Sequence, residues 1–153
     1  MLEEKGNLWK KHADGNCIII PTNGCVNSSG HAIMGRGLAK ECKDKYVMIP
    51  QLYGEHLRSY IKHNILAPPY ILLDYKIILF QTKTDWKQDS KLDVIELSAD
   101  TLCKQVRSLR TQSIISSSIY LPHLGCGEGN LKWDDVRDVL KILDDTFIAL
   151  EME

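Results

Sequence analysis

One segment of the chain joins a β-rich run to a helical pattern through a turn that contains three glycines. The run covers residues 114–120, and the turn from Leu121 to Trp133 reads Leu-Pro-His-Leu-Gly-Cys-Gly-Glu-Gly-Asn-Leu-Lys-Trp. Glycine-rich turns between a strand and a helix are where α/β proteins bind ligands. Glycines leave backbone N–H groups uncovered, and the start of the following helix is electropositive. The segment therefore predicts an α/β fold with an anion-binding loop.

Two further segments, one a glycine turn and one a polar segment, strengthen this interpretation. Residues 21–24 end a short apolar run, residues 24–37 are rich in Gly, Ser and Asn, and apolar residues then recur at four-residue spacing from Leu38, which predicts a helix from about Gly37. Residues 82–90 form a polar segment between an apolar strand and a long helical pattern. A single glycine turn can serve only to pack a helix on a sheet, so this repetition favours ligand binding.

The remaining patterns predict strands that alternate with helices. We expect a short strand within residues 5–10, further strands over 17–20, 70–73, 76–80 and 114–122, and an edge strand over 147–152. We expect helices over 48–64 and 90–109 and from Trp133 onward. Ser90 and Asp93 predict a capping box at the start of the second of these helices. This alternation predicts a three-layer α/β/α sandwich with a central mixed β-sheet. Residues 1–153 have the length of a single domain.

Composition excludes several classes of protein. Hydrophobic residues make up 44% and charged residues 25%, as in ordinary globular domains. No apolar run is long enough to span a bilayer, and the acidic start lacks signal-peptide features, so we expect a cytoplasmic monomer without a membrane segment. The five cysteines form no Cys-x-x-Cys pair, so we expect neither a metal nor a cofactor. The formal charge is −1, and the scattered basic residues give no footprint for tight nucleic-acid binding.

Taken together, the three segments resemble the macrodomain family, and specifically the subgroup that contains terminal ADP-ribose glycohydrolases and the antitoxins that remove ADP-ribose from DNA. The resemblance extends from Gly6 to the last helix. It implies that the partner is ADP-ribose, or DNA or protein that carries ADP-ribose. It also implies a set of binding residues, which are Asn7 at the adenine amino group, Asn23 at the distal ribose, Gly35, Arg36 and Gly37 along the diphosphate and distal ribose, and the loop of Gly125, Cys126, Gly127, Glu128, Gly129 and Asn130.

The resemblance also implies catalytic residues. Lys83 aligns with the lysine that attacks the anomeric carbon, or otherwise carries the catalysis, in this subgroup, and Asn23 would assist it. Cleavage at an anomeric carbon needs a carboxylate or a nucleophile close to that carbon. A lysine can be the nucleophile only while its amine is neutral, which a neighbouring cation such as Lys87 or Arg36 would favour.

One position departs from the pattern of the protein-directed glycohydrolases. They have an aspartate shortly after Gly-Cys-Gly, whereas this chain has Gly129, as expected of the DNA-directed antitoxins. Glu128, Asp85 and His123 lie near in sequence, but we assign none of them as the acid. We expect a hydrolase that removes ADP-ribose from a modified macromolecule by cleavage at the anomeric carbon of the distal ribose. The alternatives are an ADP-ribose 1″-phosphate phosphatase and a non-catalytic ADP-ribose reader.

Overall fold

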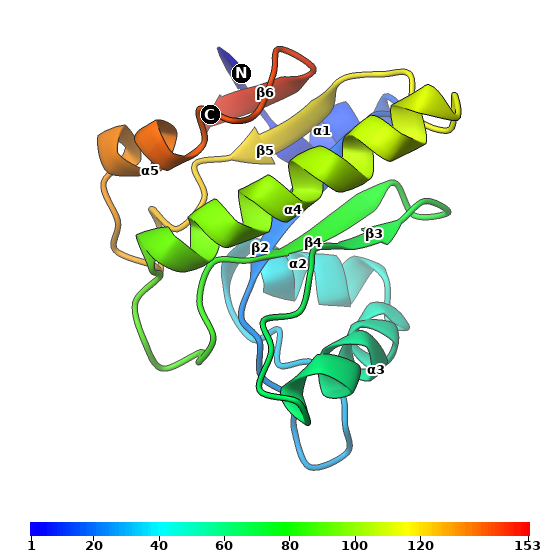
Figure 1. The fold of residues 1–153 in the computed structure, drawn as a ribbon, viewed down its shortest axis with the longest axis vertical. Coiled ribbons are helices and arrows are strands. Elements are labelled where there is room, and N and C mark those ends of the chain that lie inside the picture. The colour runs from blue at the N-terminus through cyan, green and yellow to red at the C-terminus, as the bar shows by residue number, and fades with distance from the viewer.

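The computed structural model describes residues 1–153, which fold around one six-stranded sheet (Figure 1). The strand order is β1-β6-β5-β2-β4-β3, and only the β3–β4 pair is antiparallel. In chain order the elements are β1 (Leu2–Gly6), α1 (Leu8–Ala13), β2 (Cys17–Thr22), α2 (Gly37–Lys45), α3 (Ile49–Ile61), β3 (Tyr70–Leu72), β4 (Ile77–Gln81), α4 (Leu92–Thr111), β5 (Ile119–Pro122), α5 (Trp133–Val139) and β6 (Phe147–Met152).

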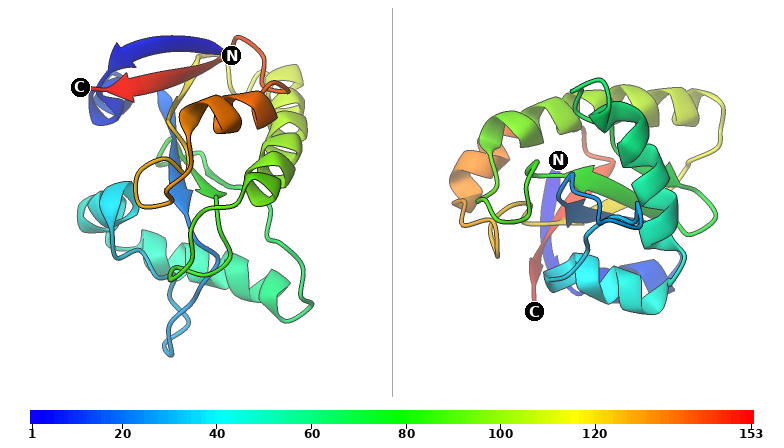
Figure 2. Two further views of the ribbon diagram at one scale, coloured as in Figure 1. Left: turned by 90° about the vertical axis from the view of Figure 1, so that its left-hand side faces the viewer. Right: turned by 90° about the horizontal axis from the view of Figure 1, so that it is seen from below.

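Helices cover both faces of the sheet. Because successive strand residues point to opposite faces, Ile19 of β2 packs in one core while Ile18 and Ile20 pack in the other. The first core is shared with α4 and α5, and the second with α1, α2 and α3. Figure 2 shows the sheet between these two helical layers. The predicted three-layer α/β/α sandwich with a mixed sheet is therefore confirmed.

The sequence prediction was wrong at both ends of the chain. The strand predicted within residues 5–10 is instead the end of β1 followed by α1, and the side chain of Asn7 caps that helix by accepting a hydrogen bond from the Lys10 N–H at 3.1 Å. The segment 147–152 is not an edge strand, because β6 lies between β1 and β5. Both errors concern which strands pair, and local patterns do not encode that pairing.

Two boundaries also differ from the prediction. Strand β5 is confined to Ile119–Pro122, so the first half of the apolar run leads into the sheet without pairing. Helix α4 has Lys91 as its N-cap residue without a side-chain cap, so the predicted capping box is wrong. The hydroxyl of Ser90 donates instead to the Thr82 hydroxyl at 3.0 Å.

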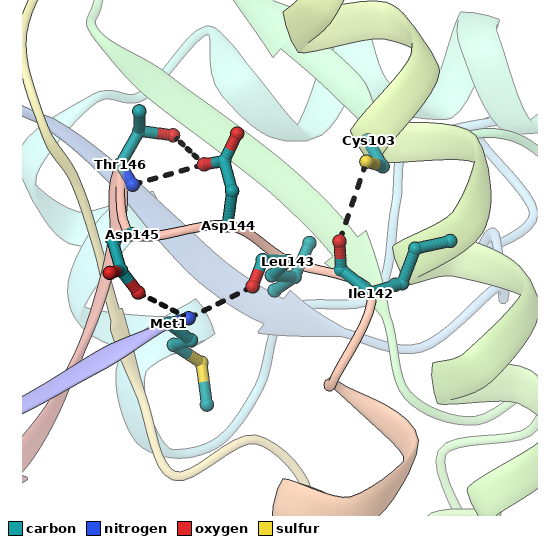
Figure 3. Close-up of polar contacts among 7 residues, drawn as sticks. All are labelled: Met1, Cys103, Ile142, Leu143, Asp144, Asp145 and Thr146. Carbon is teal, nitrogen blue, oxygen red and sulfur yellow. Dashed lines mark hydrogen bonds and ion pairs between the residues drawn. The ribbon is translucent and has the colours of Figure 1, made fainter.

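The first strand is fixed to the segment that precedes β6. The amino group of Met1 donates to the Leu143 carbonyl at 2.9 Å and to Asp145 Oδ1 at 3.0 Å (Figure 3). Asp144 accepts a hydrogen bond from the Thr146 backbone N–H at 3.0 Å, which closes the turn into β6. These bonds fix the start of β1 alongside β6, with which it pairs in parallel.

The topology defines the edge of the sheet at which a ligand can bind. Strands β2 and β5 are parallel neighbours, and the chain after β2 continues to α2 on one face while the chain after β5 continues to α5 on the other. In open α/β sheets, ligands bind in the crevice that such diverging connections leave at the carboxyl ends of the strands. None of the helices has the length and apolar character needed to cross a membrane.

Candidate active site

A cleft of about 1070 Å³ opens at this edge of the sheet. It is lined by 27 residues, which come from the segments after β2, β4 and β5 and from the end of β6. Its volume lies near the upper end of the roughly 300–1,000 Å³ typical of small-molecule sites, which suits a ligand of dinucleotide size. The structure therefore brings the three segments singled out in the sequence into one site. Among the candidate residues, the cleft lining includes Asn23, Gly35, Arg36, Gly37, Lys83, Gly125, Cys126, Gly127, Glu128, Gly129 and Asn130.

The segment that leads into α2 exposes a row of backbone donors to the cleft. The consecutive N–H groups of residues 35–39 donate to no acceptor in the protein, in part because the first turn of a helix has no intrahelical acceptors. A Cβ built on Gly35 or on Gly37 would meet no atom within 4 Å, so both glycines face open space. Gly37 also has a φ of +56°, which disfavours other residues there. We refer to residues 35–39 as the α2 cradle.

The glycine loop after β5, residues 125–129, exposes donors as well. The N–H groups of Gly127, Glu128 and Gly129 donate to no acceptor in the protein. A Cβ on Gly127 would meet nothing within 4 Å, so the loop is open at its centre. Free N–H groups of this kind bind anions. The expected contribution of the next helix is absent, because α5 starts at Trp133 and none of its residues lines the cleft.

The other two glycines of the loop are required by packing. A Cβ on Gly129 would lie 2.2 Å from Ser90 Oγ and 2.4 Å from the Gly125 carbonyl oxygen. A Cβ on Gly125, which has a φ of +75°, would lie 3.0 Å from Leu131 and 3.1 Å from Ser90 Cβ. A side chain at residue 129 would clash both with Ser90 and with the Gly125 carbonyl. The packing therefore leaves no room for an aspartate at this position.

Ser90 belongs to a buried hydroxyl network beneath the cleft. Its Oγ donates to Thr82 Oγ1 at 3.0 Å, and its N–H donates to the Gly129 carbonyl at 3.0 Å. The Thr82 N–H in turn donates to the Thr22 carbonyl at 3.0 Å, and the Thr22 hydroxyl bonds the Tyr53 hydroxyl at 2.7 Å. The network joins the ends of β2 and β4 to the glycine loop, so it fixes these segments relative to one another.

Lys83 follows directly after this network and lines the cleft. Its side chain is half-buried, and its ammonium group has neither a hydrogen-bond acceptor nor a carboxylate within ion-pair distance. An amine at the cleft without a carboxylate partner is available to a ligand. Lys87 and Arg36, the cations proposed as its neighbours, line the same cleft.

Asn23 holds the loop between β2 and α2 in shape. Its Nδ2 donates to the Ile33 carbonyl at 3.0 Å, and its Oδ1 accepts from the Cys25 N–H at 2.9 Å. Each of these atoms keeps one further proton or lone pair for a ligand. The Cys25 thiol donates to the Thr84 carbonyl at 3.3 Å, which joins this loop to the segment that carries Lys83.

Two residues considered in the sequence lie elsewhere. Asn7 does not line the cleft, and its side-chain oxygen is engaged at the start of α1, so the geometry gives no support to a contact with adenine. His31 is exposed and lies outside the cleft, as expected for a loop residue. Sequence reasoning missed Trp86 and Met152, which do line the cleft. Exposure of a large apolar side chain is visible only in the structure.

Two titratable groups of the glycine-loop segment are perturbed by burial. Desolvation raises the pKa of the Cys126 thiol, which therefore remains protonated at neutral pH and is a poor nucleophile. Desolvation also lowers the pKa of His123, whose ring stacks on Trp133 with centroids 3.9 Å apart and planes 2° from parallel. Neither residue supplies an acid at neutral pH. No cluster of three His, Cys, Asp or Glu side chains could hold a metal ion.

The charges at the cleft are few. Arg36 Nη1 lies 3.4 Å from Glu128 Oε2, so an ion pair connects the α2 cradle to the glycine loop. Both side chains are mostly exposed, at 71% and 62%. The site therefore offers an anion mainly backbone N–H groups, with Lys83 and Lys87 as its unpaired cations.

Comparison with solved structures identifies the fold. The macrodomain of Mycobacterium tuberculosis DarG superposes with a TM-score of 0.72 at 24% identity, covering 99% of this chain and 95% of that one. The macrodomain of Thermus aquaticus DarG gives 0.69 at 24% identity, with coverages of 97% and 95%. Thermosipho africanus DarTG in complex with ADP-ribose gives 0.65 at 20% identity, covering 90% of this chain and 38% of that one. The chain has the macrodomain fold.

Curated relatives define the resemblance more closely, although no protein-family model matches the chain. The DNA ADP-ribosyl glycohydrolase of Mycobacterium tuberculosis is 26% identical over 137 residues, which cover 84% of this chain and 37% of that protein. The enzyme of the same name from Thermus aquaticus is 26% identical over 131 residues, covering 80% and 34%. The chain thus spans about a third of the length of these relatives. Among macrodomains it is similar to the DarG type, which confirms the resemblance predicted from its motifs.

Proposed function

We propose that the protein is a hydrolase that removes ADP-ribose from DNA by cleaving the bond to the anomeric carbon of the distal ribose. This proposal rests on one observation: the same cleft contains two rows of backbone N–H groups without acceptors and a lysine without a carboxylate partner. DNA is favoured over protein as the carrier because the relatives are named DNA ADP-ribosyl glycohydrolases. The absence of room for an aspartate at Gly129 agrees with that choice.

The geometry suggests how ADP-ribose binds. The diphosphate lies between the α2 cradle and the glycine loop, where the N–H groups of residues 35–39 and 127–129 can donate to its oxygens. The distal ribose then reaches the segments that carry Asn23 and Lys83, which follow β2 and β4. Gly35, Gly37 and Gly127 leave the space that the diphosphate needs.

Lys83 acts as the nucleophile in this proposal. Its neutral amine attacks the anomeric carbon and forms a C–N bond, while the bond to the DNA base breaks with its electron pair on the leaving atom. The leaving base takes up the proton that the lysine nitrogen loses as the C–N bond forms. Water then displaces the lysine: its oxygen bonds the anomeric carbon and one of its protons returns to the nitrogen, so that ADP-ribose is released and the amine is regenerated. The free proton and lone pair of the Asn23 amide hold the ribose hydroxyls during these steps.

The decisive experiment is the Lys83→Ala substitution assayed on a thymidine oligonucleotide that carries ADP-ribose. We expect turnover to fall by at least about 100-fold, with ADP-ribose affinity within a few-fold of wild type because the backbone supplies most of the binding. Lys83→Arg should fail equally, since guanidinium stays charged. The matched control is Lys62→Ala at the end of α3, an exposed lysine that does not line the cleft. Full turnover by Lys83→Ala contradicts the lysine mechanism.

A parallel assay separates this function from its alternatives. The wild-type protein is given ADP-ribosylated oligonucleotide, protein ADP-ribosylated on glutamate, and ADP-ribose 1″-phosphate. Release of ADP-ribose from the oligonucleotide supports the proposal. Release of inorganic phosphate alone identifies the phosphatase, and ADP-ribose binding without turnover of any substrate identifies a reader.

A further inference from the structure

Trp86 is exposed at the cleft although it is a large aromatic side chain. It retains 41% of its accessible surface, and it is the one aromatic residue among the exposed large hydrophobic side chains of the molecule. Its indole N–H has no hydrogen-bond acceptor in the protein, and the residue lines the cleft that holds Lys83. Neither core packing nor a hydrogen bond explains its presence. A partly exposed aromatic ring beside a ligand cleft is a surface on which a planar group can stack.

Two lysines of the segment that carries Trp86 have no carboxylate partner and can contact an anion. The ammonium of Lys87 lies over the indole ring, 5.5 Å from its centroid. Neither Lys87 nor Lys83 has a carboxylate within 4.0 Å. The two acids of the same segment are engaged locally, because Asp85 Oδ1 accepts from the Lys87 N–H at 3.0 Å and Asp89 Oδ1 accepts from Asn130 Nδ2 at 2.8 Å.

Trp86 lies three residues after Lys83, and both line the cleft. Lys83 and Trp86 lie on the segment after β4, and the Gln88 N–H donates to the Asp85 carbonyl at 3.1 Å to form a turn around Trp86 and Lys87. Strand β4 is separated from β6, which lines the opposite side of the cleft, by β2 and β5. If Lys83 attacks the anomeric carbon as proposed above, the group that leaves this carbon departs close to the segment that carries Trp86.

We propose that Trp86 and Lys87 form a platform that binds the DNA strand carrying the ADP-ribose, with a nucleobase stacked on Trp86 and a backbone phosphate at Lys87. This inference rests on the function proposed above and adds a determinant of its specificity. Stacking of bases on aromatic side chains and cation contacts to the backbone are the features that proteins use to hold single strands. A peptide carrier has no nucleobase and gains nothing from the platform.

The test compares affinities within one protein background. In the Lys83→Ala background, which prevents turnover, fluorescence anisotropy measures binding of a short ADP-ribosylated thymidine oligonucleotide, and calorimetry measures binding of ADP-ribose. Adding Trp86→Ala should lower the ratio of the oligonucleotide affinity to the ADP-ribose affinity by about 5- to 100-fold, the range seen for one stacked base. Trp86→Phe should restore part of this ratio because phenylalanine keeps a ring.

Three controls make the result specific. Leu97→Ala removes another exposed apolar side chain, on α4 outside the cleft, and should leave the ratio unchanged. Binding of an ADP-ribosylated glutamate peptide should show no platform effect. Lys87→Ala should reduce the slope of log affinity against log salt for the oligonucleotide by about 0.7, the value for one phosphate contact on a single strand.

Three outcomes would overturn the platform, and a fourth would overturn only the proposed reaction. An unchanged affinity ratio in Trp86→Ala shows that no base stacks there, and an equal loss for the peptide shows that Trp86 binds protein instead. An equal loss for ADP-ribose itself assigns Trp86 to the ADP-ribose site. If wild-type protein fails to hydrolyse the oligonucleotide while the ratio still depends on Trp86, the proposed reaction fails and the platform stands.

Discussion

The α2 cradle and the glycine loop have the same sequence character but use their glycines for different physical reasons. In the α2 cradle, Gly35 and Gly37 face open space, and the free N–H groups arise because a helix begins there. In the glycine loop only Gly127 faces open space. A Cβ on Gly129 would clash with Ser90 and the Gly125 carbonyl, and a Cβ on Gly125 would press against Leu131, Ile95 and Ser90. A glycine at a ligand site can therefore serve the ligand or the packing beneath it.

Because the glycines serve different purposes, substituting them should affect either ligand affinity or the stability of the fold. A side chain placed on a glycine that faces the cleft should exclude the diphosphate without disturbing the fold. A side chain placed on Gly129 must displace the Gly125 carbonyl as well as Ser90, so it should destabilise the whole loop. Substitutions at matched positions can distinguish these two cases.

The largest effect is expected for Gly129→Asp, which would introduce the aspartate of the protein-directed enzymes. Its Cβ would lie 2.2 Å from Ser90 Oγ and 2.4 Å from the Gly125 carbonyl oxygen. We expect a loss of at least about 2 kcal/mol in unfolding free energy, as for overpacking of a dense interior, measured by urea denaturation.

The variant should also bind ADP-ribose poorly, since the loop must move. Adding Ser90→Ala should not rescue it, because the clash with the Gly125 carbonyl remains and Ser90 Cβ lies 2.7 Å from the same point. A stable Gly129→Asp protein with normal ADP-ribose binding would show that the loop adapts and that packing does not exclude the aspartate.

Gly127→Val should reverse this pattern. A Cβ there meets nothing within 4 Å, so the unfolding free energy should stay within about 0.5 kcal/mol of wild type. Affinity for ADP-ribose should fall by about 10- to 100-fold, since hydrogen bonds to a charged diphosphate are displaced. Calorimetry and thermal denaturation measure the two effects separately.

The matched control for Gly127→Val is Gly35→Val in the α2 cradle, which faces the same open space. Both variants should remain folded and lose affinity. Normal affinity in a folded Gly127→Val protein would remove the glycine loop from the binding site.

Local patterns predicted the parts of the fold that depend on local chemistry. Apolar residues at helical spacing predicted α2, α3 and α4, and the β3–β4 hairpin followed from two apolar runs around a turn. The three segments that line the cleft were found because glycine and polar residues directly follow apolar strands. These features need no knowledge of what lies across the sheet.

The remaining features depend on contacts between distant residues. The pairing of β1 with β6 joins the two ends of the chain, and no local pattern specifies it. Ser90 and Asp93 have the spacing of a capping box, yet the Ser90 hydroxyl bonds Thr82 and its N–H bonds the Gly129 carbonyl. Likewise, sequence shows that Gly125, Gly127 and Gly129 are glycines, but only the position of Ser90 shows which of them are needed for packing.

His123, which lies two residues before the glycine loop, should make the stability of the fold depend on pH. Burial lowers the pKa of His123 below 6.5; the nearby carboxylates of Glu3 and Glu151 oppose this shift, and Arg137 adds to it. A histidine with a lowered pKa in the folded state stabilises the fold above pH 6.5, and this contribution is lost as the pH falls through the lowered pKa.

The matching variant is His123→Phe, which keeps an aromatic ring on Trp133 but does not titrate. We expect wild type to lose thermal stability relative to His123→Phe as the pH falls below 6.5, and the two curves to run parallel above it. Denaturation temperatures measured over this range provide the test. Parallel curves at every pH would mean that His123 protonates equally well in the folded and unfolded chain.

The smallest effect is expected for Glu128→Gln, which breaks the ion pair that connects the two regions. The pair spans 3.4 Å between side chains that are 71% and 62% exposed, and exposed pairs contribute about 0–1 kcal/mol. The unfolding free energy should therefore change little. At low salt ADP-ribose should bind about two- to three-fold more tightly, because a carboxylate near the diphosphate is lost and Arg36 is freed. This gain should vanish at high salt, and Lys40→Gln, which breaks an exposed ion pair with Asp44 within α2, is the matched control. If Glu128→Gln instead weakens binding strongly, the side chain of Glu128 is part of the ADP-ribose site, and the glycine loop binds through more than its backbone.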